Sequence, residues 1–323
     1  MIGDTLFIFL GLAVLLVGGD LLVRGAVGIA GAFRVPALIV SLAIIAFGTS
    51  APELVVSVAA VLEKEPGIAV GNIVGSNIAN ILLVLGLPAL AHPMLTRVDG
   101  LRRHGLVLIA ATAALAGVAY FGGVLGRGLG LAFIAGIIAY VAFLAFLARG
   151  SRARDPVIDE VAEYSDGGKT GLGASLAYVA CGLIGLPIGA DILVVHGSAL
   201  ASSFGARPEV IGLTIVALGT SLPELATVGA AAFRKRSEVA IGNVIGSNIF
   251  NIFAVGGAAG LAGGFTFGPE TLRFDLPVMI AASLALAAFV LARRDIGRLA
   301  GFVFVAAYAA FIAALFFIGA SAP

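Results

Sequence analysis

Hydrophobic residues fill ten long stretches of this chain, and polar segments separate them. Each stretch is about 18 to 25 residues long, which is the length that a helix needs to cross a hydrocarbon layer about 30 Å thick. We therefore predict ten transmembrane helices. Their approximate bounds are 5–23, 37–62, 67–91, 105–122, 128–148, 172–195, 208–233, 239–262, 275–292 and 299–318.

The composition favours an all-α integral membrane protein over a soluble domain. Of the 323 residues, 60% are hydrophobic and 11% are charged, which is too apolar for an ordinary soluble protein. The net charge of +1 provides no basic surface for nucleic acid. Cys181 is the sole cysteine, so we expect no disulfide within the chain and no thiolate metal site. We also expect no bound cofactor.

One polar interruption is longer than the others and divides the chain. Residues 149–171 hold a run of charged side chains and a Gly-Gly pair, a composition typical of a linker. We predict membrane repeats over residues 1–148 and 172–323, with five helices each. All but four of the 19 Lys and Arg residues fall on one side of this arrangement, which predicts that side to be cytoplasmic. Both termini then lie outside and the linker lies inside.

The two halves share a sequence pattern at an offset of 171 residues. The segment GTSAPE at 48–53 returns as GTSLPE at 219–224, and GNIVGSN at 71–77 returns as GNVIGSN at 242–248. An odd number of helices in each half orients the two copies oppositely in the membrane. Inverted repeats of this kind are typical of secondary transporters.

The first motif places a proline and a glutamate in the middle of an apolar helix. Pro52 has no N–H for the carbonyl of Gly48, and Pro223 has none for Gly219, so we predict helix breaks that free backbone oxygens. The side chains beside these breaks are Thr49, Ser50 and Glu53 in the first copy and Thr220, Ser221 and Glu224 in the second. A glutamate at mid-membrane is costly, which favours a function for it.

The second motif places polar side chains along one face of the following helix. Asn72, Ser76 and Asn80 recur every four residues and share a face. The second copy has Asn243, Ser247 and Asn251. Together, the motifs offer carboxylates, hydroxyls, amides and backbone carbonyls, a set of oxygen ligands that suits Ca²⁺. Without a cation, two carboxylates would repel each other and tend to bind H⁺ or Na⁺. Such competition is a physical basis for exchange.

At these residues the chain resembles the Na⁺/Ca²⁺ exchanger family of the Ca²⁺:cation antiporters, in its prokaryotic ten-helix form. The resemblance covers both repeats, about residues 37–91 and 208–262. It implies that Glu53 and Glu224 are the central Ca²⁺ ligands. The further ligands that it implies are Thr49, Ser50, Thr220, Ser221, Ser76, Ser247, Asn80 and Asn251 through side chains, and Ala46 and Ala217 through backbone carbonyls.

The resemblance also implies a function. We expect an antiporter, not an enzyme, that exchanges Na⁺ for Ca²⁺ across the plasma (inner) membrane by alternating access, with the lipid bilayer as its surroundings. Potassium-dependent relatives have Asp where this chain has Asn251, so we expect K⁺ not to be required. Two alternatives use the same site: a Ca²⁺/H⁺ antiporter and a potassium-dependent exchanger. A hydrolase using Ser50 or Ser221 is disfavoured, because no His or Lys lies at mid-span to serve as its base.

Overall fold

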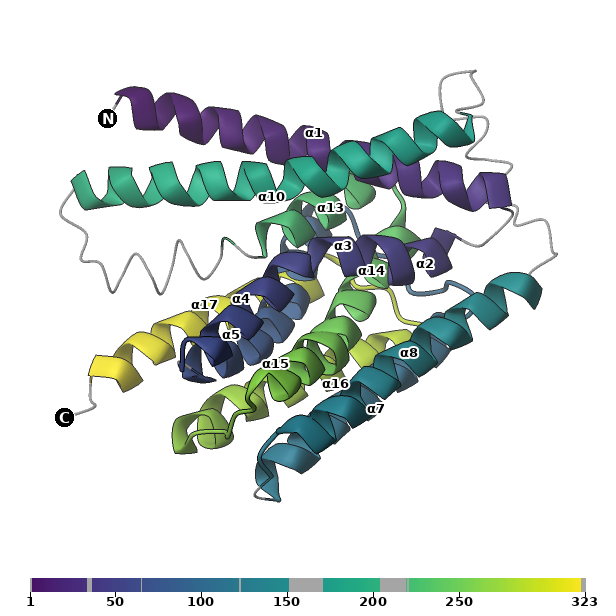
Figure 1. Cartoon of the computed structure of the whole chain (residues 1–323). Coiled ribbons are helices and arrows are strands. Elements are labelled where there is room, and N and C mark those ends of the chain that lie inside the picture. Colours follow the sequence, from purple (N-terminus) through teal and green to yellow (C-terminus); the bar gives the residue numbers. More distant parts are fainter. Residues whose placement is uncertain are drawn as a thin grey trace. The chain divides into compact units, whose positions relative to one another are not determined.

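The computed structural model describes residues 2–33, 37–64, 66–121, 123–150, 171–203, 219 and 221–320 (Figure 1). Within these ranges the chain is almost entirely helical. Eight helices are long and apolar enough to cross a membrane, and a bent pair over residues 41–62 makes a ninth. A shorter apolar helix, Leu222–Phe233, lies in the remaining predicted span, whose residues 208–218 are outside the described part. The all-α membrane fold is therefore confirmed.

Several spans in the first half consist of consecutive helical segments, where η denotes a π-helix. The elements are α1 (Ile2–Phe33), α2 (Ala37–Val40), η1 (Ser41–Ile45), α3 (Ala46–Thr49), α4 (Ala51–Leu62), α5 (Pro66–Ala79), η2 (Asn80–Leu85), α6 (Gly86–Ala91), α7 (Leu101–Tyr120) and α8 (Arg127–Gly150). Thus the predicted span 37–62 contains four segments and the predicted span 67–91 contains three.

The second half repeats this construction. Its elements are α10 (Leu172–Ser203), α13 (Leu222–Phe233), α14 (Ser237–Phe250), η4 (Asn251–Val255), α15 (Gly256–Ala262), η5 (Thr271–Asp275), α16 (Leu276–Leu291) and α17 (Arg298–Ala320). Local backbone geometry follows the repeat as well. Ser50 has φ −88° and ψ 6°, and Ser221, its counterpart, has φ −88° and ψ 1°. Lys64 and Lys235, also counterparts, both have positive φ where a helix ends.

Helix α1 extends ten residues beyond its predicted end at residue 23 and reaches Phe33. The charged residues that suggested an earlier end are satisfied within the helix and beside it. Asp20 pairs with Arg24 one turn later, at 2.8 Å, and also with Arg234. Pairs at this helical spacing support the helix rather than interrupt it. The repeat equivalents of Asp20 and Arg234 are Asp191 and Glu63, which are both acidic.

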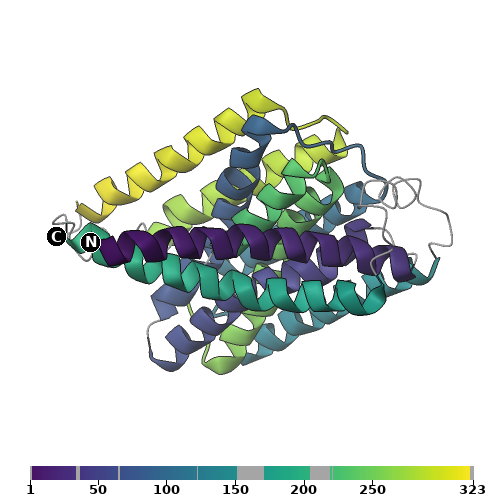
Figure 2. The same ribbon diagram turned by 90° about the horizontal axis from the view of Figure 1, so that it is seen from above.

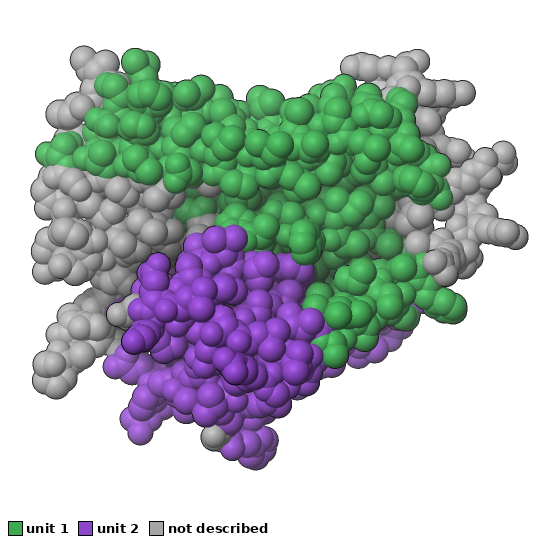
Figure 3. Space-filling model, in the orientation of Figure 1, with its two compact units in different colours: residues 1–52, 135–247 green, residues 53–134, 248–323 purple. Residues whose placement is uncertain are grey.

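The described chain divides into two compact units, coloured separately in Figure 3. Unit 1 comprises residues 1–52 and 135–247, and unit 2 comprises residues 53–134 and 248–323. Each unit therefore combines segments from both halves of the chain.

In unit 1, α1 and α10 lie side by side and run antiparallel (Figures 1 and 2). Glycines allow their backbones to meet. A Cβ on Gly182 would lie 2.8 Å from the carbonyl oxygen of Gly18, and one on Gly189 would lie 3.0 Å from that of Gly11. By the repeat offset of 171 residues, Gly11 corresponds to Gly182 and Gly18 corresponds to Gly189. Each of the two contacts is therefore the repeat counterpart of the other. This antiparallel pair therefore has internal two-fold pseudosymmetry.

Unit 2 has the same pseudosymmetry. Met94 pairs with Ile296, and Leu125 pairs with Phe265, and the repeat offset converts the first pair into the second. A similar exchange relates two helix contacts, which are formed by Gly86 with Gly301 and by Gly257 with Gly130. In both units, a contact between one segment of each half has its repeat counterpart between the corresponding segments. This relation confirms that the halves are inverted repeats.

The spans that carry the second motif are the most enclosed. In the most hydrophobic 18-residue stretch of Ser237–Ala262, 94% of the residues are buried, whereas the corresponding share for Arg298–Leu315, in α17, is 17%. Large apolar side chains such as Phe146 and Leu299 are exposed on the outer helices. Exposed apolar surface of this extent is typical of helices that face lipid.

Candidate cation-binding site

The helix that carries the first GTS-x-PE motif is interrupted at Ser50. Segments Ser41–Thr49 and Ala51–Leu62 meet there at an angle of 47°. The amide of Ser50 still donates to the carbonyl of Ala46, at 3.1 Å, so α3 is complete up to that residue. Pro52 follows directly and cannot continue the hydrogen-bond ladder. In the second copy, Ser221 is the N-cap of α13 and Pro223 lies in its first turn.

In unit 1, hydroxyl groups surround the second motif glutamate. Ser50 Oγ donates a hydrogen bond of 3.1 Å to Glu224 Oε1, and the hydroxyls of Thr49 and Ser247 lie 3.5 Å apart. Glu224 is 1% exposed, and among the described residues its Oε2 has no hydrogen-bond partner. We call Thr49, Ser50, Glu224 and Ser247 the Glu224 cluster. A buried carboxylate with an unused oxygen is suited to a cation.

Close packing of α14 on the broken helix produces this cluster. Gly246 lies against Ala46 and Leu42, where a Cβ would meet the Ala46 Cβ at 2.7 Å. Ser41 Oγ donates to the carbonyl of Val239 at 2.7 Å, one further contact between the same segments. Because Gly246 permits this approach, the neighbouring Ser247 reaches Thr49.

In unit 2, the first motif glutamate is bound through its backbone. Asn72 Nδ2 donates to the carbonyl oxygen of Glu53 at 3.0 Å and to Ser57 Oγ at 2.9 Å. Ser76 Oγ donates to Asn72 Oδ1 at 3.5 Å. Glu53 is 1% exposed and Ser57 is fully buried. We call Glu53, Ser57, Asn72 and Ser76 the Glu53 cluster.

Three asparagines lie close to the start of the π-helical segments of unit 2. Asn80 Nδ2 donates to Asn248 Oδ1 at 3.3 Å. Asn251 is fully buried, and neither atom of its amide has a hydrogen-bond partner within the described ranges. Asn80 begins η2 and Asn251 begins η4. π-helical turns are frequent at functional sites, and a buried, unsatisfied amide requires an explanation such as a bound ion.

The helix termini favour negative charge at both glutamates. Glu53 lies in the first turn of α4 and Glu224 in the first turn of α13, where the partial positive charge of the helix N-terminus stabilises a carboxylate. The carbonyl of Ala46, at the other side of the first break, accepts from the amide of Ser50 and from Thr49 Oγ1.

The remaining predicted site residues are distributed as follows. Ser221 is buried and makes no side-chain cap hydrogen bond, and Gly219 is helical. Ala217 and Thr220 lie outside the described residues. Within the described ranges, no three His, Cys, Asp or Glu side chains converge as metal ligands. Hydroxyls, amides and carbonyls would therefore provide most of the oxygens around either glutamate.

Sequence reasoning did not identify Ser57 or Asn248 as parts of these clusters. Ser57 could have been found, because it lies one turn after Glu53 on the same helix face. Asn248 lies one turn before Asn251, but its bond to Asn80 joins residues 168 positions apart. Local periodicity carries no information about such a contact.

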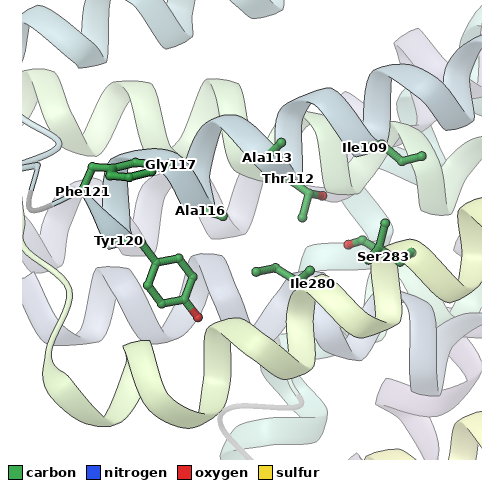
Figure 4. Close-up of a pocket in the computed structure, with 10 residues that line it drawn as sticks. Ile109, Thr112, Ala113, Ala116, Gly117, Tyr120, Phe121, Ile280 and Ser283 are labelled. Atoms are coloured by element: carbon green, nitrogen blue, oxygen red, sulfur yellow. The ribbon is translucent and has the colours of Figure 1, made fainter.

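A pocket of about 440 Å³ in unit 2 is not part of either cluster. It lies between α7 and α16, where Thr112 and Ser283 point toward each other (Figure 4). The lining is otherwise apolar apart from Tyr120 and includes no charged residue. It provides no carboxylate for a cation.

Inverted membrane repeats, with a buried carboxylate in the first turn of the helix that follows the motif serine in each copy, define a secondary ion transporter. Comparison with known families is more specific. The sodium/calcium exchanger protein family matches residues 4–147 and 174–317. The chain belongs to this family, which is a family of transporters and not of enzymes.

Known relatives cover almost the whole chain. It is 34% identical to the inner membrane protein YrbG of Escherichia coli over 89% of this chain and 88% of that protein. It is 34% identical to the sodium/calcium exchanger MaX1 of Methanosarcina acetivorans over 98% of this chain and 99% of that protein. A solved structure of the sodium-calcium exchanger NCX_Mj, soaked with Na⁺ and Sr²⁺, superposes with a TM-score of 0.83 at 32% identity. That match covers 97% of this chain and 98% of the other.

Proposed function

We propose that this protein is an antiporter that exchanges Na⁺ for Ca²⁺ across the plasma (inner) membrane by alternating access. One observation carries the proposal: each inverted repeat has a glutamate that is 1% exposed, in the first turn after the motif serine. Membership of the sodium/calcium exchanger family supports it. MaX1 is named as a sodium/calcium exchanger, and NCX_Mj has been soaked with Na⁺ and with Ca²⁺.

The proposed ligands for the transported ions come, in each repeat, from the predicted span that carries the GTS-x-PE motif and from the span that follows it. Glu53 and Glu224 provide the carboxylates. The other proposed ligands are the hydroxyls of Thr49, Ser50, Ser76, Thr220, Ser221 and Ser247, the amides of Asn80 and Asn251, and the backbone carbonyls of Ala46 and Ala217.

Burial of the carboxylates explains why such a transporter would change conformation with an ion bound and not with an empty site. An unneutralised carboxylate at the membrane centre costs at least about 2.5 kcal/mol. The hydroxyls of Ser50 and Thr49 hydrogen-bond the Glu224 side chain, but neither carries a positive charge, so a cation would provide most of its compensation. Na⁺ or Ca²⁺ can provide it, and the two ions compete. A conformational change is then favourable only with a cation bound, which couples the two fluxes.

We further propose that both termini lie outside the cell and that linker 149–171 is cytoplasmic. The excess of Lys and Arg on one side supports this orientation. The backbone pairs support the alternation of ten spans, since Met94 with Ile296 and Leu125 with Phe265 each join loops that this alternation would put on one side.

Transport into proteoliposomes tests the proposed function. We expect Ca²⁺ uptake into vesicles loaded with Na⁺, in K⁺-free medium, and none with an equal choline load or with a pH gradient alone. Glu53→Gln and Glu224→Gln keep side-chain size but remove the charge, so each should reduce uptake at least about a hundredfold, the effect of losing a few kcal/mol of ion binding.

The controls separate the alternatives. Size-exclusion profiles and helical content of both variants should match those of the wild type. Uptake that requires a proton gradient would replace Na⁺ by H⁺ as the coupling ion, and uptake that requires K⁺ would refute our assignment of Asn251. Normal exchange in either glutamine variant would exclude the proposed site.

A further inference from the structure

Asn72 connects two proposed ligands through opposite ends of its amide. Its Nδ2 donates to the backbone oxygen of Glu53 at 3.0 Å and to Ser57 Oγ at 2.9 Å. Its Oδ1 accepts from Ser76 Oγ at 3.5 Å. One side chain therefore joins the start of α4 to the middle of α5. Asn72 is not itself among the proposed ligands.

The second repeat has the asparagine but lacks two of these three contacts. The offset pairs Asn72 with Asn243, Ser76 with Ser247, and Ser57 with Val228. Ser247 Oγ donates to Asn243 Oδ1 at 3.5 Å, as in the first repeat.

The two asparagines differ in the hydrogen bonds that their side-chain nitrogen, Nδ2, donates. Asn243 is fully buried, and among the described residues its Nδ2 has no hydrogen-bond partner. Val228 cannot accept a hydrogen bond, whereas Ser57 can. A buried amide nitrogen without a partner is rare in folded proteins. The sequence difference at this one position thus corresponds to a difference in bonding.

We propose that Asn72 is a positioning residue, which fixes Glu53 relative to Ser76, and that Asn243 has no such role toward Glu224. The backbone of Glu53 determines where its side chain begins, and Asn72 holds α4 against α5 by two hydrogen bonds, one to that backbone and one to Ser57 Oγ. Ligands that are ordered in advance bind an ion without a further loss of conformational entropy. Glu53 is then the preorganised carboxylate, and Glu224 is held through its side chain by Ser50.

The inference rests on the proposed function, because it concerns residues proposed to bind the transported ions. Two readouts keep the questions separate. The first is the concentration dependence of Na⁺-driven Ca²⁺ uptake in proteoliposomes, analysed for half-saturation and maximum rate. The second is the Ca²⁺-induced rise in melting temperature of the purified protein, which requires binding but no transport.

Four variants form a matched set. Asn72→Leu and Asn243→Leu both remove the bond to the following serine, but only Asn72→Leu removes the bonds to Glu53 and Ser57. Ser57→Val gives the first repeat the side chain that the second has naturally. Val228→Ser gives Asn243 the acceptor that it lacks.

We expect Asn72→Leu to raise the half-saturating Ca²⁺ concentration about tenfold or more, the effect of losing the bonds to Glu53 and Ser57 in addition to the one to Ser76, and to change the maximum rate much less. Asn243→Leu should shift half-saturation less than about threefold, and Ser57→Val should be intermediate. Val228→Ser should lower half-saturation by about two- to threefold. The Ca²⁺-induced melting shift should follow the same order.

Equal shifts in Asn72→Leu and Asn243→Leu would overturn the inference, as would a Ser57→Val protein indistinguishable from wild type. Should Asn72→Leu fail to fold, Ser57→Val and Val228→Ser still decide the question. A wild-type protein that Ca²⁺ stabilises but that does not exchange Ca²⁺ for Na⁺ would refute the proposed function alone. A wild-type protein stabilised by neither ion would refute both.

Discussion

Single residues give the two motif glutamates different surroundings. Glu224 receives a hydrogen bond at its carboxylate from Ser50, whereas Glu53 is contacted at its backbone oxygen by Asn72. Both side chains are buried, so each contact acts in a region of low dielectric where hydrogen bonds to charged groups are strong. The hydroxyl of Ser50 therefore compensates part of the cost of burying Glu224 when no cation is present.

This predicts a cation-dependent stability for Ser50→Ala. Hydrogen bonds to charged groups contribute about 1.5–3 kcal/mol, so in a chelating, Na⁺-free buffer the variant should melt several degrees below wild type. Ca²⁺ should reduce the difference, because the ion provides most of the compensation of the carboxylate and Ser50 is only one of its proposed ligands. Ser221→Ala is the control, since Ser221 makes no side-chain cap hydrogen bond. Equal losses in the two variants, measured by thermal melting, would contradict the prediction.

The sequence was sufficient to select the polar residues but not their partners. Thr49, Ser50 and Glu224 could be chosen because a proline-broken apolar helix has few other reasons to carry them. The bond from Ser50 to Glu224, in contrast, joins residues 174 positions apart. It depends on how closely Gly246 allows α14 to approach Ala46, and that distance is a property of packing.

Among the helices, the α1 and α10 pair shows how small residues control packing in this protein. Without a hydrophobic driving force inside a bilayer, helices associate through close backbone contact at small residues. Gly182 of α10 meets the backbone of α1 at Gly18 and Leu22. Gly173, near the start of the same helix, has no neighbour within 4 Å of a Cβ.

We predict that Gly182→Ala destabilises the protein by about 1–3 kcal/mol, because the new Cβ would lie 2.7 Å from the Leu22 Cβ and would force the helices apart. Gly173→Ala should leave stability unchanged or raise it slightly, since alanine has the higher helix propensity. Thermal melting in detergent compares the two. The prediction is wrong if Gly182→Ala melts at or above the temperature of Gly173→Ala.

The lengths of the hydrophobic stretches were sufficient to predict that the helices exist, but not where each of them ends. The structure extends α1 to Phe33 because Asp20 has cationic partners in Arg24 and Arg234. Hydropathy counts these charges as a boundary, since it does not consider their pairing. The π-helical segments η2 and η4 were likewise invisible to a 3.6-residue period.

At the scale of the whole molecule, the repeat seen in the sequence does not coincide with the compact units. Each unit takes segments from both halves, and within each unit the repeat exchanges pairs of contacts. The offset alone could indicate inversion, through the odd number of spans. Which helices pair across the pseudosymmetry had to come from the structure.

The orientation of the chain is testable with single cysteines. In a Cys181→Ser background, we predict that a membrane-impermeant maleimide added to intact cells labels Gly268→Cys but not Gly168→Cys, and that Gly168→Cys becomes reactive once the membrane is permeabilised. The prediction rests on the positive charge in and beside the linker, which favours a cytoplasmic position. Gly268 is a suitable site because a Cβ there has no neighbour within 4 Å. The opposite labelling pattern would invert the proposed topology.

The pair formed by Asp20 and Arg234 is an exception to the two-fold relation. Its counterpart positions hold Asp191 and Glu63, two acids that cannot attract each other. Ion gradients alone fix the direction of net flux, and no side chain can alter that equilibrium. An exchanger made of identical halves would, however, run equally fast in both directions under mirrored gradients. Because Asp20 and Arg234 attract each other and the counterpart residues Asp191 and Glu63 cannot, this protein has a basis for unequal forward and reverse rates, and so for behaving as a rectifier.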